Sequence, residues 1–197
     1  MPSPAARAPY IRAMERRQVV VRRSLPTDPA VRAGSSLYLA ETAGQGLALR
    51  RQLVQAGPQP APAHVAERLG LTPGQPAWAR RRLFFADEVP VRLSTSWFLV
   101  ELAEGTPLGD PDFVGEGLQA HFEGRGLRFG RLLETLTARP PTAEEAAALE
   151  LSAPEPVVQI LRSSYEAGGL HVHTLESICA AGRHLFEIRP LPDDRVF

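Results

Sequence analysis

The chain has 197 residues, of which 44% are hydrophobic and 22% are charged, and its formal net charge is zero. This composition suits a globular chain with a substantial core and excludes a disordered segment or a uniformly basic nucleic-acid binder. No apolar run is long enough to span a membrane, the N-terminus lacks the apolar centre of a signal peptide, and one cysteine, Cys179, cannot form a disulfide framework. We therefore expect a cytoplasmic protein.

The first segment is basic. All 22 basic residues of the chain are arginine, and seven of them fall within residues 1–32, together with only two acidic residues. Such a segment is either a nucleic-acid arm or a solvated leader. A short strand is predicted at residues 19–23, VVVRR, and a turn follows it.

An internal repeat covers most of the remaining chain. Residues 35–98 match residues 115–178 at a constant offset of 80 without a gap, with thirteen identities. Several identities fall on glycines and prolines, which mark the ends of helices and strands, for example Gly46 with Gly126 and Pro60 with Pro140. We interpret this pattern as a duplication.

Each copy predicts the same series of elements. A helical segment that ends at glycines is followed by a strand at 47–56 in the first copy and 127–138 in the second. A helix comes next, at 63–71 in the first copy; in the second it starts at Thr142, which with Glu145 has the spacing of a capping box. A hairpin closes each copy, at 79–98 and 157–178.

Strand, helix and hairpin, repeated twice, predict an α+β fold with a largely antiparallel sheet and helices packed on it. Two related halves would face each other across a pseudo-twofold axis. A groove between such halves is a natural place for a small molecule.

The order and spacing of these elements resemble those of a known family. Residues 62–98 and 130–187, which contain both helices and both hairpins, closely resemble the UTRA domain, the effector-sensing module of the HutC branch of GntR-type bacterial transcription regulators. The resemblance covers roughly residues 20–190. It implies a chorismate-lyase-like fold, a homodimer and a small anionic or polar metabolite as effector, with no cofactor.

The resemblance also implies an organisation into domains. Residues 1–19 would be a basic leader or linker remnant, residues 20–190 the ligand-binding domain and residues 191–197 a tail. We expect the family's winged helix-turn-helix to be missing here, so contact with DNA would need a separate or longer chain. Two rival functions remain open: a chorismate-lyase-like enzyme, and a degenerate domain that serves only in dimerisation.

The first hairpin provides the main candidate ligand residues. Arg80 and Arg82 lie on one face of a predicted strand and Arg81 on the other, and arginine presents a fork of donors that suits a carboxylate or phosphate. The resemblance places an Arg-x-Arg pair on the pocket side, whereas an ordinary solvated strand face is the alternative.

The second strand of this hairpin carries the hydroxyls of Ser94, Thr95 and Ser96, which match the family's hydroxyl-rich pocket strand. Plain edge-strand hydroxyls are the alternative. A catalytic serine is disfavoured because the chain has no G-x-S-x-G motif. We therefore expect no enzymatic activity.

The second copy supplies further candidates through the resemblance. Glu176, at the repeat position of Ser96, would accept hydrogen bonds from a ligand. Shortly after it the family has an Asp-Arg pattern, where this chain has Gly-Arg-His; His184 would replace the ligand contact that is usual there. Gly117 and Gln119 match the start of a pocket-side helix, although Gln119 stands where tyrosine is frequent.

Two further features have an open or ordinary interpretation. Arg131 and Glu134 match a pocket-side strand, but a structural ion pair is the slightly favoured alternative. His171 and His173 share a strand face without a third metal ligand nearby, so we expect no metal site.

Overall fold

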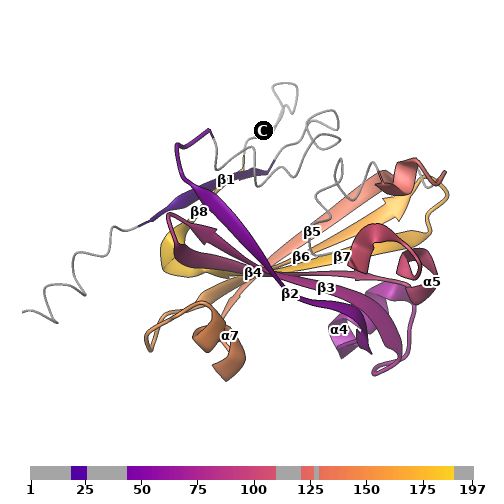
Figure 1. The fold of residues 1–197 in the computed structure, drawn as a ribbon, viewed down its shortest axis with the longest axis horizontal. Coiled ribbons are helices and arrows are strands. Elements are labelled where there is room, and N and C mark those ends of the chain that lie inside the picture. Colours follow the sequence, from indigo (N-terminus) through magenta and orange to yellow (C-terminus); the bar gives the residue numbers. More distant parts are fainter. Residues whose placement is uncertain (1–18, 26–43, 110–120, 127–128, 189–197) are drawn as a thin grey trace, which may run out of the picture.

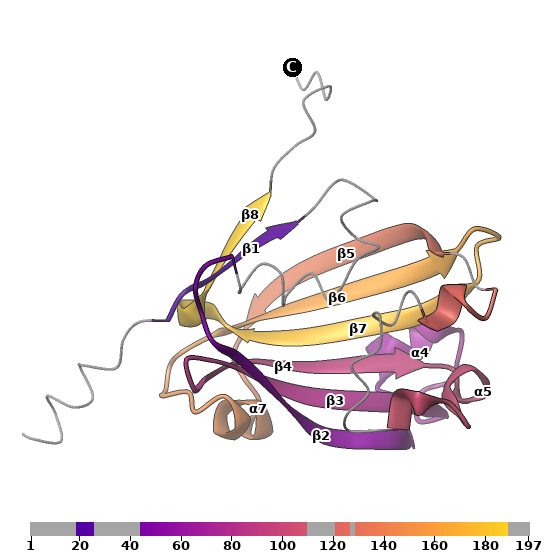
Figure 2. The same ribbon diagram turned by 45° about the horizontal axis from the view of Figure 1, so that its top comes forward.

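The computed structural model describes residues 19–25, 44–109, 121–126 and 129–188. Its centre is a six-stranded antiparallel sheet in the order β2-β3-β4-β7-β6-β5, and a separate parallel pair, β1 and β8, lies beside it (Figures 1 and 2). The strands are β1 (Val21–Leu25), β2 (Leu49–Pro60), β3 (Pro76–Ala86), β4 (Val89–Phe98), β5 (Phe129–Arg139), β6 (Val157–Glu166), β7 (His171–Ala180) and β8 (His184–Ile188).

The order of the strands reproduces the duplication. The first half contributes β2, β3 and β4, the second half contributes β5, β6 and β7, and the two halves meet where β4 pairs with β7. One helix follows the first strand of each half: α4 (Ala63–Leu69) and α7 (Ala143–Ala148). The α+β prediction is confirmed, and the sheet is symmetric about the β4–β7 pair.

The local sequence explains the two helices. Thr142 forms the predicted capping box, in which its hydroxyl accepts a bond from the Glu145 N–H at 3.2 Å and the Glu145 carboxylate accepts from the Thr142 N–H at 2.8 Å. The helix α4 begins after Pro62, which makes no side-chain cap, and ends at Gly70 with a φ of 69°.

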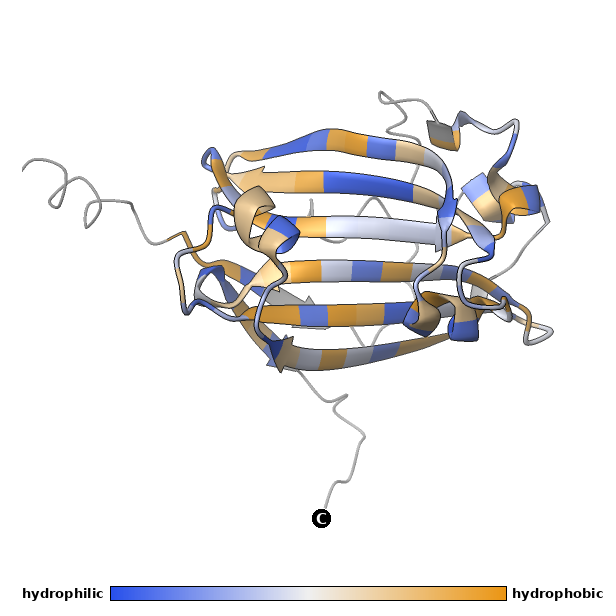
Figure 3. Cartoon of the chain, turned by 90° about the horizontal axis from the view of Figure 1, so that it is seen from below, coloured by the Kyte–Doolittle hydropathy of each residue, from blue (hydrophilic) through white to orange (hydrophobic). Residues whose placement is uncertain are grey.

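Both helices cover the same face of the sheet, which we call the helix face. The apolar residues of α4 pack on Ala77, Ala79 and Trp97, and Leu149 after α7 packs on Leu93 and Ile178. Figure 3, viewed from below Figure 1, shows hydrophilic and hydrophobic residues interspersed along the strands that these helices cross.

The opposite face has an apolar cluster at each end. At one end, Phe98 and Trp78 pack with Leu108, which belongs to the 3₁₀ turn η2 (Pro107–Gly109), and with the short helix α5 (Val100–Ala103). At the other end, Phe84 packs with Val21 of β1. Between the two clusters lie the central parts of the strands. A further 3₁₀ turn, η3 (Ala181–Arg183), joins β7 to β8.

The gapless offset of 80 is wrong in the last strand of the repeat. Arg82 pairs with Ser94 across the first hairpin, whereas the equivalent Arg162 pairs with Leu175, so the second hairpin is one residue longer. A slip of one residue turns every side chain to the opposite face. Structurally, Ser177 rather than Glu176 is therefore the counterpart of Ser96.

The predicted strand at 19–23 is present as β1, which begins two residues later. The predicted leader to residue 18 and the tail at 191–197 lie outside the described residues. None of the described helices is long and apolar enough to cross a membrane.

Candidate ligand-binding face

Strand register brings the main candidates together. Arg80 pairs with Ser96 and Arg82 with Ser94, so these four side chains share the face opposite α4 and α7. Arg92, which pairs with Phe84, lies on the same face. We call this group, Arg80, Arg82, Arg92, Ser94 and Ser96, the arginine face.

The arginine face is largely buried. Arg80 is 2% exposed and Arg92 is 4% exposed. The guanidinium of Arg80 donates a hydrogen bond to the Leu108 carbonyl at 2.6 Å, which ties the sheet to η2. Burial of an arginine is costly unless its donors are satisfied, so a face that gathers three of them needs a specific cause.

Several buried polar atoms on this face have no partner among the described residues: Arg82 Nε, Ser96 Oγ and His173 Nε2. The Ser94 hydroxyl lies 3.3 Å from that of Ser177 on β7. Buried polar groups in proteins are almost always hydrogen-bonded, so these atoms are suitable contacts for a polar ligand.

The electrostatics of the face favour an anion. Burial, together with repulsion by Arg80, Arg92 and Arg51, lowers the pKa of Arg82 to about 9. Burial and nearby Arg162 lower the pKa of His173 to about 3, so this imidazole is neutral at pH 7. The charge on the face is therefore carried by guanidinium groups, and a bound anion would relieve their repulsion.

Two other candidates lie on the helix face. Thr95 pairs with Glu176, so alternation turns both away from Arg80 and Arg82. The Glu176 carboxylate accepts a hydrogen bond from Gln159 at 2.6 Å and lies 2.9 Å from His64 Nε2. Burial alone would raise the pKa of Glu176, but the hydrogen bonds with His64 and Gln159 and the charge of His64 together outweigh burial and lower it. Here Glu176 joins α4 to the sheet.

The remaining candidates are dispersed. The guanidinium of Arg131 lies over the Tyr165 ring at 4.5 Å, and Glu134 pairs with Arg162 at 3.3 Å. His184 is buried at the start of β8, where its Nδ1 lies 3.0 Å from the Ala180 carbonyl. Gly117 and Gln119 lie outside the described residues.

Sequence reasoning missed Arg92 and Ser177. The signal for Arg92 was present, because Arg92, Ser94 and Ser96 alternate along one strand and so share a face. Interpreting the hydroxyls as a consecutive run obscured that alternation. Ser177 could be identified only from the register of β4 against β7, and the gapless repeat predicted Glu176, one residue away, in its place.

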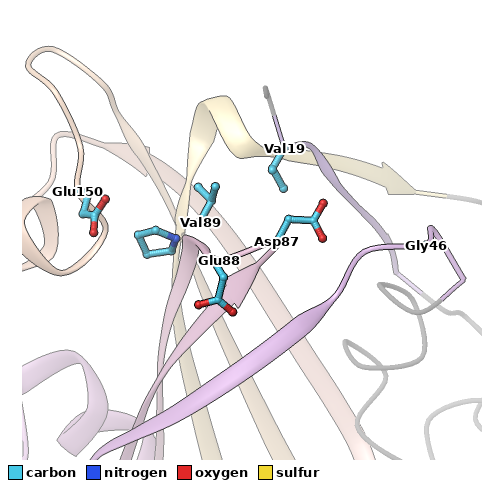
Figure 4. A pocket seen from close by; sticks show the side chains of 7 residues that line it. Val19, Gly46, Asp87, Glu88, Val89 and Glu150 are labelled. Atoms are coloured by element: carbon cyan, nitrogen blue, oxygen red, sulfur yellow. The ribbon is translucent and has the colours of Figure 1, made fainter. Parts of the chain in front are cut away.

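A hollow of about 560 Å³ lies elsewhere, beside the β3–β4 turn (Figure 4). It is lined by three acidic residues, Asp87, Glu88 and Glu150, and by four residues without side-chain charge, Val19, Gly46, Val89 and Pro90. Its carboxylates would repel an anion, and no residue of the arginine face lines it. We therefore place the candidate site on the arginine face.

The two histidines of β7 have separate contacts. His171 bonds to the Arg68 carbonyl and lies 3.0 Å from the His173 carbonyl, while the His173 ring stacks on Phe98 at 4.7 Å. Within the described residues, no group of three or more His, Cys, Asp or Glu could hold a metal ion.

Comparison with known proteins agrees with this architecture. The model of the UTRA domain family matches residues 44–184. An HTH-type transcriptional regulator from Streptomyces coelicolor is 31% identical over 152 residues, which cover 74% of this chain and 56% of that protein. The HTH-type transcriptional repressor PhnF of Mycolicibacterium smegmatis is 28% identical over 153 residues, covering 78% and 62%.

Solved structures show the same relationship. The crystal structure of the effector domain of PhnF from Mycobacterium smegmatis superposes with a TM-score of 0.69 at 26% identity, covering 87% of this chain and 99% of that one. The longer PhnF structure gives a TM-score of 0.70 at 25% identity, with coverages of 87% and 72%. The chain spans about 56% and 62% of the two curated relatives, and it matches an effector domain over nearly that domain's whole length. It belongs to the UTRA domain family, and its homologues are GntR-family transcriptional regulators.

Proposed function

We propose that the chain senses a small anionic or polar metabolite, which it binds on the arginine face. The observation that carries this proposal is the gathering of buried guanidinium and hydroxyl groups in the middle of the sheet, where Arg82 Nε and Ser96 Oγ lack partners among the described residues. Of the candidates that the sequence predicts, we retain Arg80, Arg82, Ser94 and Ser96 for this site. Thr95 and Glu176 are not retained, because they face the helices.

The proposed role is regulatory and not enzymatic. The relatives are HTH-type regulators, which supports a cytoplasmic sensor of the HutC branch whose effector shifts the population between two conformations of a homodimer. Contact with DNA would be made by a winged-helix domain, either separate or part of a longer chain.

A thermal-shift screen with phosphosugars, amino acids and organic acids tests the sensor proposal. A ligand at one hundred times its Kd stabilises the folded state by about 2.7 kcal/mol and raises the Tm. We expect at least one anionic compound to act in this way and Ser96→Val to weaken the response. Absence of any response across the panel would contradict a sensor role and favour dimerisation alone, which light scattering can measure independently.

A further inference from the structure

A series of hydrogen-bonded side chains crosses the helix face from one helix to the other. It runs from α4 through β7, β6 and β5 to α7, and we call its members the polar chain: His64, Glu176, Gln159, Arg139 and Glu145. Figure 1 shows α4 and α7 apart from each other on the same side of the sheet. The apolar clusters beside the two helices are separate, so the polar chain connects two helices that pack independently.

The contacts of the polar chain are continuous. His64 Nε2 lies 2.9 Å from the Glu176 carboxylate, which also accepts a hydrogen bond from the Gln159 amide at 2.6 Å. The side-chain carbonyl of Gln159 accepts from Arg139 Nε at 3.2 Å. The two terminal nitrogens of Arg139 donate to the two oxygens of Glu145 at 2.7 Å each. Glu145 lies in the first turn of α7, so the polar chain ends on that helix.

Gln159 forms the central link, and its amide fits in one orientation only. A guanidinium only donates and an ionised carboxylate only accepts, so the carbonyl must face Arg139 and the NH₂ group must face Glu176. Gln159 pairs directly with Thr137 on β5 and with Ile178 on β7. Its two partners are therefore diagonal neighbours, which only long side chains reach. An apolar side chain at this position would break the polar chain at its centre.

The duplication does not reproduce the polar chain. Val65 and Ala79 stand at the repeat positions of Glu145 and Gln159, and both belong to the apolar cluster beside α4. Thr95 is the structural counterpart of Glu176, because the second hairpin is one residue longer. The first half therefore has neither the amide nor the carboxylates at these positions, and the polar chain is a single link that reaches from the second half to α4.

We propose that the polar chain is a coupling device, through which a displacement of α4 or α7 is transmitted to the helix of the other half. Hydrogen bonds in series polarise one another, so the loss of one link weakens the next. Each member acts through its neighbours, so all five are positioning residues. The device does not depend on which molecule the chain senses.

A double-mutant cycle of urea denaturation on the full chain tests the coupling. We expect His64→Ala and Glu145→Ala together to raise the equilibrium constant of unfolding about fivefold less than the two single effects multiplied. The reason is that Arg139 and Glu176 balance each other once both end residues are removed. Glu144→Ala is the matched control for Glu145→Ala, because it removes the same charge one residue away on α7 but pairs outside the polar chain. Its effect should combine with that of His64→Ala to within about twofold of the product.

Gln159→Met tests the route of the coupling. This change keeps the length of the side chain and removes the central amide, so the effects of His64→Ala and Glu145→Ala should multiply to within about twofold in this background. Independent effects of the same two changes in the wild-type background would overturn the coupling. Coupling that persists with Gln159→Met would overturn the route through the amide.

If Glu145→Ala or Gln159→Met does not fold, a change at the more exposed end of the polar chain decides. The His64 side chain is 40% exposed, so His64→Ala leaves the apolar core intact. In ¹⁵N-labelled protein this change should shift the Nε–H signal of Arg139, which is three hydrogen bonds away. The Nε–H signal of Arg50, which pairs with Glu88, is the control and should not move. An unchanged Arg139 signal would overturn the coupling.

Discussion

The two halves of the sheet share one plan but differ in how their charges are satisfied. In the second half, Arg162 pairs with Glu134 and Arg139 binds Glu145 through two bonds of 2.7 Å. In the first half, Leu53 stands opposite Arg82, and α4 begins without a side-chain cap.

This difference indicates that the two halves took on different roles after the duplication. A carboxylate beside an arginine stabilises the fold and also prevents that arginine from binding an anion. The second half has such a carboxylate beside Arg162, whereas in the first half burial and repulsion by Arg80, Arg92 and Arg51 lower the pKa of Arg82. We therefore expect changes in the second half to alter stability and changes in the first half to alter binding.

The largest effect on stability should come from Glu145→Ala in the second half. The change removes both bonds to Arg139 and the reciprocal cap at Thr142, and the loss of charge-assisted bonds in this partly buried pair costs about 1.5–3 kcal/mol. Urea denaturation at pH 7 measures it. Glu144→Ala, next along the helix at 71% side-chain exposure, is the control and should cost less than about 1 kcal/mol.

The same pair gives a pH dependence. Burial alone would raise the pKa of Glu145, but hydrogen bonds from Arg139 and Thr142 outweigh burial and hold it below its usual value. A carboxyl whose pKa is depressed by folding contributes stability above its unfolded pKa, about 4.3, and loses that contribution as the pH falls through the folded value. The difference in the free energy of unfolding between wild type and Glu145→Ala should therefore become smaller in acid. A constant difference would contradict the ionic contribution.

Glu134→Gln tests whether the second half can be made to resemble the first. The free energy of unfolding should fall by about 1.5 kcal/mol, because Arg162 loses a charged partner whose side chain is only 11% exposed. Phosphate should then raise the Tm of this variant more than that of wild type. Equal phosphate dependence in both proteins would show that Glu134 does not mask an anion site.

The converse change is Leu53→Glu, which places a carboxylate opposite Arg82. We expect phosphate affinity to fall about tenfold, equivalent to 1.4 kcal/mol, because the new carboxylate competes for the guanidinium. Val54→Glu is the matched control, because this substitution adds the same charge one residue away, at a position that is 52% exposed. A similar loss in both variants would indicate a general effect of charge.

The smallest effect should come from Thr142→Ala, which removes the capping hydroxyl of α7 but leaves the Arg139–Glu145 pair. A lost cap costs about 1 kcal/mol. Thermal unfolding should show a correspondingly lower Tm, whereas Thr137→Ala on the exposed strand β5 should change it less. Equal shifts would mean that the capping bond adds nothing to stability.

Local patterns were sufficient to predict much of this fold. The capping box at Thr142, the hairpin at 79–98 and the alternation that separates Arg80 and Arg82 from Arg81 are all properties of a few neighbouring residues. The pairing of β4 with β7 could not be predicted in the same way. Its register depends on one extra residue in the second hairpin. Because of this extra residue, Glu176 lies on the helix face and not on the face that the repeat predicted.

The members of the candidate site could be predicted only in part, for the same reason. The patterns of their own strands were sufficient to predict Arg80 and Ser96 as candidates, and the two residues pair across the hairpin. The pairing of Arg82 with Arg92 around Phe84 joins two strands, and the contrast with Arg162 depends on which residue stands opposite each arginine. Cross-strand neighbours of this kind follow from register and not from spacing along the chain.

The packing of Val21 against Phe84 has a mechanical consequence. Val21 is completely buried and belongs to β1, the strand that leads out of the domain toward residue 19, while Phe84 carries the two guanidinium groups on its ring. The ring near the two guanidinium groups and the side chain of Val21 therefore belong to the same buried cluster. A displacement of the Phe84 ring would therefore disturb this cluster and, with it, the position of β1 against the sheet.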